Sequence, residues 1–273
     1  MVAQNSLGLT TLAPTVRLEQ PLGAQAQIAI ELAQRTLSSE SGAWLTIAGS
    51  PSFWSAGSVL DVHIGSLAQL RPSGFVLVVA RPTIGCPAPG VTSEEVEGLC
   101  RTVYSLSART QVIVSHGDLA ALPAVAAGAT GLGSGWDIRQ QVLGGDAFQI
   151  STTFRRRGRR VTHRGLLSVL KRREAEALRA RDALLSSRLI PGMLPIAQND
   201  EWELHLHTLA EVAKQVTALP SGQPRADELH RLYSVANTDF RTVESLIRLE
   251  HGKQEWLDPV KGGLERYMAA EGW

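Results

Sequence analysis

The feature that most constrains the fold is an alternation of short apolar runs with amphipathic segments between residues 24 and 145. The clearest run, GFVLVVA at residues 74–80, has the β-branched residues and continuous hydrophobicity of a strand buried on both faces. Similar runs at residues 43–48, 111–114 and 129–132 predict three more short strands, and segments with helical periodicity separate the four. This alternation is typical of a parallel sheet with right-handed crossovers.

Beyond about residue 150 the pattern becomes helical, and it predicts helices over 166–188, 202–219, 226–233 and 238–249. The chain then divides into an N-terminal arm (1–23), a β/α domain (24–150), an arginine-rich connector (151–165) and an all-helical domain (166–273). Four β/α units are half of an eightfold barrel. We therefore expect an α/β fold with a four-unit, parallel, half-barrel-like (TIM-type) domain followed by the all-helical domain. An open flavodoxin-like sheet is the alternative.

Composition limits the class of protein. Of the 273 residues, 44% are hydrophobic and 19% charged, as in ordinary globular proteins, and no apolar run is long enough to span a membrane. Two cysteines, Cys86 and Cys100, are too few for a disulfide framework or a four-thiolate zinc site. We expect a cytoplasmic location, no membrane partner and no metal; His205 and His207 lie two apart on an expected helix, where we read them as surface contacts.

The stretch from residue 112 to 136, VIVSHGDLAALPAVAAGATGLGSGW, joins two expected strands to glycine-containing turns. It resembles the last two β/α units of phosphate-binding (β/α)8 barrels, such as the flavin- and nucleotide-binding enzymes that include inosine-monophosphate dehydrogenase. The resemblance implies a site for a phosphorylated ligand at the carboxyl ends of the strands. The first lysine of the chain is Lys171, so the β/α domain offers no lysine for Schiff-base chemistry.

Polar residues and glycines follow the expected strands, and they supply the candidate site. Glycines let backbone N–H groups approach an anion, and an arginine can clamp it. The candidates for phosphate binding are Arg81, Gly117, Gly133, Ser134 and Gly135. His116 is the candidate for proton transfer, with Asp118 beside it. A turn histidine, a helix-capping aspartate and a surface arginine are the simpler interpretations of His116, Asp118 and Arg81.

Charge is strongly uneven along the chain. Residues 151–190 carry 12 basic and 3 acidic side chains, whereas residues 191–273 carry 8 basic and 13 acidic ones. The densest part of the basic block contains Arg155, Arg156, Arg157, Arg159, Arg160 and Arg164. Such a cluster predicts salt-dependent contact of residues 155–173 with nucleic acid or with a protein partner. Neutralisation by the acidic C-terminal helices, within the chain or between subunits, is the alternative.

Two functions follow. The first is a barrel-type element that binds a phosphate-bearing small molecule or nucleotide, with proton or group transfer as its chemistry. The second is a non-catalytic scaffold or assembly module that contacts nucleic acid or protein through the arginine-rich connector. The sequence identifies no cofactor. Because four parallel strands leave two unpaired edges, we expect a capping helix from the first 40 residues, or a homo-oligomer or partner chain that completes the sheet.

Overall fold

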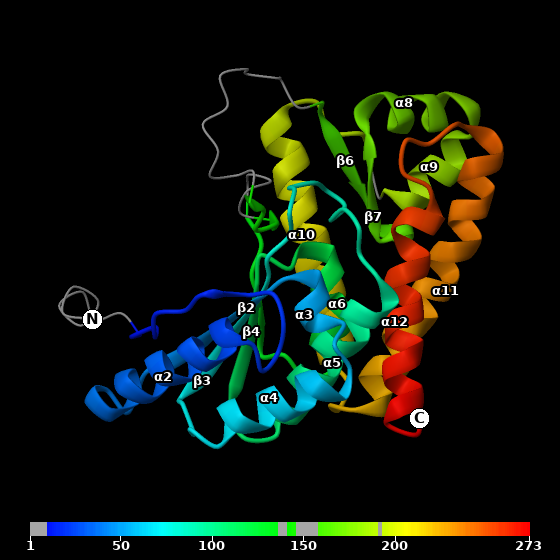
Figure 1. Ribbon diagram of the computed structural model, residues 1–273. Helices are drawn as coiled ribbons and strands as arrows, with labels where there is room; N and C mark the ends of the chain where they lie inside the picture. The colour runs from blue at the N-terminus through cyan, green and yellow to red at the C-terminus, as the bar shows by residue number, and fades with distance from the viewer. Residues whose placement is uncertain (1–9, 136–140, 146–157, 191–192) are drawn as a thin grey trace.

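A computed structural model describes residues 10–135, 141–145, 158–190 and 193–273 (Figure 1). Its main sheet has five parallel strands arranged in chain order, β1-β2-β3-β4-β5. The strands are β1 (Arg17–Leu18), β2 (Trp44–Gly49), β3 (Gly74–Val79), β4 (Gln111–Ser115) and β5 (Gly131–Leu132). The parallel α/β architecture is therefore confirmed. The order differs from the flavodoxin-like alternative, in which the first strand lies inside the sheet.

The edge beside β2 is covered by the N-terminal arm, not by the expected helix. β1 pairs with the last two residues of β2, and Leu12 forms an isolated parallel bridge to Trp44 at its start. The segment that the sequence left without regular structure thus supplies a fifth, two-residue strand. Edge strands this short expose few unpaired backbone groups.

Helices connect the parallel strands. They are α2 (Ala24–Ser39), α3 (Pro51–Trp54), α4 (Ser58–Ala68), α5 (Ser93–Ser107), the 3-10 helix η1 (Asp118–Ala121) and α6 (Leu122–Ala126). The cap of α5 is Thr92, whose hydroxyl accepts a hydrogen bond from the Glu95 amide at 3.2 Å. Glu94 and Glu95 in the first turn favour the positive end of the helix dipole.

The prediction of one long helix over residues 166–188 is wrong. Its first part is an antiparallel hairpin, in which β6 (Arg160–His163) pairs with β7 (Ser168–Lys171) across the short η3 (Arg164–Leu166). Val169 and Leu170 are both buried, so adjacent side chains meet apolar surroundings on opposite faces, as in a covered strand. Helix begins only at α8 (Arg172–Arg181), and Asp182 then caps α9 (Ala183–Leu189) through its carboxylate.

The C-terminal part contains α10 (Gln198–Thr217), α11 (Gln223–Leu246), η4 (Lys253–Glu255) and α12 (Leu257–Ala270). α11 is continuous where the sequence predicted two helices, and α12 lies beyond the last helix that the sequence predicted. α12 packs along α5, and α10 contacts β6 and α6 (Figure 1). A single apolar cluster consequently runs from Leu45 in the sheet to Tyr267 in α12.

Candidate functional site

The carboxyl end of β4 holds the two residues expected to move protons. His116 and Asp118 follow the strand with φ angles of 55° and 47°, both in the left-handed region. Asp118 is the first residue of η1, which has no side-chain capping hydrogen bond, so Asp118 is not the expected helix cap. Its side chain points instead into a cluster formed with the C-terminal half of the chain.

Asp118 is the centre of this cluster. Its Oδ1 accepts hydrogen bonds from His205 Nε2 at 2.6 Å and from the Ser134 hydroxyl at 3.1 Å. The Cys86 thiol donates to its Oδ2 at 3.5 Å. Burial, together with the charge of Asp118, raises the pKa of Cys86 well above its ordinary value, so this thiol stays protonated and is a poor nucleophile.

Thr162 extends the cluster into a hydroxyl–imidazole–carboxylate chain. Its Oγ1 lies 2.8 Å from His205 Nδ1, on the opposite side of the ring from Asp118. With Nε2–H donating to the carboxylate, Nδ1 accepts a hydrogen bond from the Thr162 hydroxyl. The order of groups is that of a catalytic triad. The chain is nevertheless inaccessible to a substrate in this conformation, since Thr162, His205 and Asp118 are exposed by 2%, 4% and 1%.

Sequence reasoning missed His205 and Thr162. We interpreted His205 as a surface residue, and the structure corrects this. The signal was present in the spacing, because His205 shares one helical face with Leu209, Val212 and Val216, all of which are buried. Thr162 gave no comparable signal, because it lies in a strand that the sequence did not predict.

Arg81 does not present a free guanidinium to a ligand. It forms a two-pronged ion pair with Glu95, in which both side chains are only 3% exposed, and it also donates to the Pro89 carbonyl at 3.2 Å. Burial raises the pKa of Glu95, and the charge of Arg81 opposes that shift. The clamp expected for a ligand phosphate therefore already holds an anion of the protein itself.

The glycine turns serve close packing. The Gly117 amide donates to the Gly133 carbonyl at 3.1 Å, and the Gly133 amide donates to Val114 at 2.8 Å. A Cβ on Gly117 would lie 2.4 Å from that of Ala121. The amides of Gly117 and Gly133, which the sequence suggested as an anion site, thus already donate hydrogen bonds within the protein. The Gly135 carbonyl accepts a hydrogen bond from the Gln141 side-chain amide.

His116 and Arg81 do approach one another. Both line an internal cavity of about 10 Å³ between the sheet, α5 and η1. A cavity of this size holds at most one water molecule. His116 is a half-buried turn histidine whose Nδ1 lies 2.9 Å from the Ser115 hydroxyl, and burial lowers its pKa.

In the described part of the connector, Arg159 pairs with an acidic side chain of α10, as the neutralisation alternative predicts, and two basic residues that follow the connector are also paired. Arg159 forms an ion pair with Glu201 at 2.8 Å, Arg172 lies 3.3 Å from the same carboxylate, and Lys171 pairs with Glu250. Arg164 donates to the Gln215 amide oxygen at 3.1 Å. Arg155, Arg156 and Arg157 lie outside the described residues.

The solvent-exposed side of α8 is strongly basic, and its arginines spread around more than half of the helix circumference, because Arg179 and Arg181 lie only two positions apart. Arg173, Arg179 and Arg181 are exposed, and none of the three forms an ion pair within the described part of the chain. The acidic residues of α8 are otherwise engaged: Glu174 is buried and accepts two backbone amides, and Glu176 pairs with Arg172 at 2.7 Å. Sequence reasoning included Arg173 in the basic stretch but not Arg179 or Arg181.

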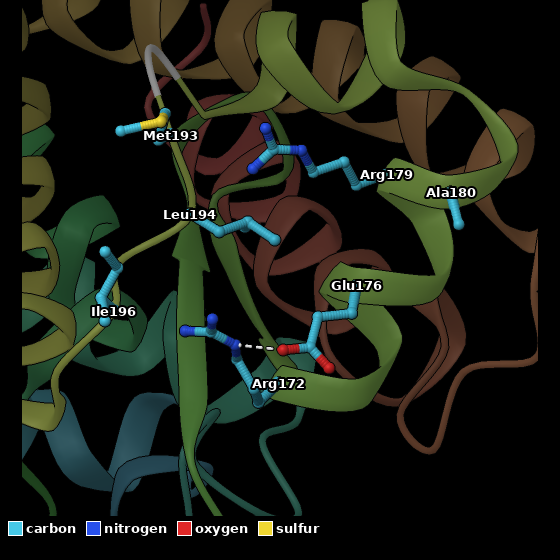
Figure 2. A pocket seen from close by; sticks show the side chains of 7 residues that line it. All are labelled: Arg172, Glu176, Arg179, Ala180, Met193, Leu194 and Ile196. Atoms are coloured by element: carbon cyan, nitrogen blue, oxygen red, sulfur yellow. Dashed lines mark hydrogen bonds and ion pairs between the residues drawn. The ribbon is translucent and has the colours of Figure 1, made fainter.

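A groove of about 480 Å³ lies between α8 and residues 193–196. Figure 2 shows the Arg179 guanidinium reaching from α8 toward Met193 and Leu194, with the Arg172–Glu176 pair at the other end. Met193 and Ile196 are 76% and 77% exposed, so two apolar side chains of the 193–196 wall face solvent. The groove thus combines cationic and apolar walls.

Comparison of the chain with models of known protein families, with curated proteins and with solved structures gave no significant match. Among the residues that the structure describes, no group of three or more histidine, cysteine, aspartate or glutamate side chains is arranged to hold a metal ion. None of the described helices is both long and apolar enough to cross a membrane.

Proposed function

We propose that this protein binds nucleic acid through the exposed arginines of α8, a helix that packs against the β6–β7 hairpin, α9 and α11. The observation that carries the proposal is the set of three exposed arginines, Arg173, Arg179 and Arg181, that are unpaired among the described residues. They extend over about 12 Å of helix axis. Duplex DNA carries one negative charge per roughly 1.7 Å of its axis, so several phosphates lie within reach of these arginines.

The first function suggested by the sequence, a phosphorylated small ligand at the strand ends, has less support. Its arginine is paired with Glu95, the amides of Gly117 and Gly133 are used internally, and the adjoining cavity admits one water molecule. We also propose that the sheet is a barrel-like half whose β5 edge pairs with another chain. The consecutive strand order supports this layout.

The test of nucleic-acid binding is fluorescence anisotropy with labelled oligonucleotides at several salt concentrations. We expect affinity to fall steeply between 50 and 200 mM salt, as counterion release requires. The triple variant R173Q/R179Q/R181Q should bind much more weakly, and the slope of log K against log salt should decrease by about 0.9 for each arginine that contacts a phosphate.

The matched control is R35Q/R109Q/R241Q, which removes three exposed arginines elsewhere on the chain. It changes the net charge equally, so it separates a specific face from a general charge effect. The proposal fails if wild type does not bind at 50 mM salt, or if both triple variants lose affinity to the same extent.

A further inference from the structure

The groove between α8 and residues 193–196 shares Arg179 with the basic side of α8 and adds apolar side chains to it. Its lining includes Met193, Leu194 and Ile196 beside Arg179, and its volume of about 480 Å³ falls within the usual range of ligand pockets. Exposed aliphatic side chains do not contribute to phosphate binding, and covering them removes apolar surface from water, which is favourable. The apolar wall therefore points to a ligand that is anionic in one part and apolar in another.

The two ends of the groove differ in charge. Arg172 is already engaged by Glu176, Glu201 and the Pro195 carbonyl, so it neutralises local carboxylates and shapes the groove. Arg179 extends into the groove (Figure 2) and forms no ion pair within the described residues. A planar guanidinium facing an aliphatic wall is suited to hold a flat ring between them, because arginine planes and apolar side chains both stack on bases.

We propose that this groove receives an unpaired base, so that the protein prefers single-stranded nucleic acid to a duplex. The inference rests on the proposed function, because Arg173 and Arg181 would hold the flanking phosphates while Arg179 stacks on the base. A duplex keeps its base faces inside the helix and would meet Met193 and Ile196 with sugar and phosphate. A single strand can turn a base face outward and cover these side chains.

The experiment compares binding of a fluorescent single-stranded oligonucleotide with that of the same sequence as a duplex, for wild type and M193S/I196S. We expect wild type to favour the single strand. In M193S/I196S, single-strand affinity should fall by about five- to tenfold while duplex affinity stays unchanged. In a single strand that contains 2-aminopurine, binding to wild type should change the emission more than binding to the variant.

The control variant is I28S/V62S, which removes two exposed aliphatic side chains from α2 and α4, outside the groove. It should keep the strand preference of wild type. Equal affinity of wild type for single strand and duplex, or an M193S/I196S variant that keeps the preference, would overturn the groove assignment. Salt-dependent binding that R173Q/R179Q/R181Q weakens would still support the basic side of α8. Absence of any binding would overturn both.

Discussion

At the scale of single residues, His163 shows how burial determines a protonation state. Its ring is fully buried, Nδ1 lies 3.0 Å from the Val161 carbonyl, and Nε2 has no hydrogen-bond partner among the described residues. Burial lowers its pKa to about 4, so the ring is neutral and Nδ1–H donates to the carbonyl. A histidine that must stay neutral in the folded protein makes stability depend on pH.

We predict that this histidine destabilises the fold in acid. Its pKa is lower in the folded state than the ordinary value of 6.5. The neutral ring therefore contributes its full share to the free energy of unfolding above pH 6.5, and this share is lost as pH falls toward 4. The full loss amounts to about 3 kcal/mol. Urea unfolding at a series of pH values measures it, and H163L should have a shallower decrease between pH 6.5 and 4. Removing the exposed His207 in H207Q should leave the wild-type slope, and an H163L slope equal to that of wild type would refute the assignment.

The candidate site illustrates what single residues reveal in sequence. The structure places His116–Asp118 directly after β4 and Gly133 directly after β5, at strand ends as the sequence predicted, because strand ends and turn residues have local signatures. The hydrogen-bond and ion-pair partners of the candidate site residues were not predicted. Asp118 meets His205 across 87 positions of the chain, and Arg81 meets Glu95 through a loop of irregular structure. A pairing of this kind depends on tertiary packing, which no local pattern encodes.

At the scale of elements, the strands β2, β3 and β4 lie within a residue of their predicted bounds because each is a continuous apolar run. The β6–β7 hairpin was not predicted because each of its strands has only four residues, which is too short to show a clear strand pattern. The leucines around residue 167 also fit a helical period. The α5–α12 contact was not foreseen either. It depends on Gly263, whose missing side chain lets α12 approach α5.

We predict that G263A is strongly destabilising. An added Cβ would lie 2.4 Å from the Val96 Cβ and 2.7 Å from the Ser93 carbonyl oxygen, so the helices would have to separate. The expected loss in unfolding free energy is about 2–3 kcal/mol. The matched control is G65A in α4, where the structure places nothing within 4 Å and where alanine should stabilise the helix by about 0.5–1 kcal/mol. Thermal unfolding followed by circular dichroism distinguishes the two, and equal midpoints would disprove the close contact.

At the scale of the whole molecule, the segments that the sequence separates into two domains share buried structure. The apolar cluster crosses from the sheet to α10, α11 and α12, and the indole of Trp256 donates to the Leu167 carbonyl within it. The polar chain Thr162–His205–Asp118 joins the hairpin, α10 and the end of β4 in the same region. We infer that this hydrogen-bond network fixes the position of one half of the protein relative to the other, because a buried polar network tolerates only one arrangement of its partners.

If the network couples the two halves, they should unfold together in one transition. Urea unfolding followed by far-ultraviolet circular dichroism and by tryptophan fluorescence should give coincident single transitions. D118N should shift both transitions equally and lower the unfolding free energy by about 2 kcal/mol, since it replaces a charged acceptor by a neutral one while asparagine tolerates the left-handed backbone. E255Q, which alters the exposed His251–Glu255 pair, should cost less than about 0.5 kcal/mol. Separate transitions in the wild type would show that the halves are independent, and the network would then be a local contact of the β4 turn.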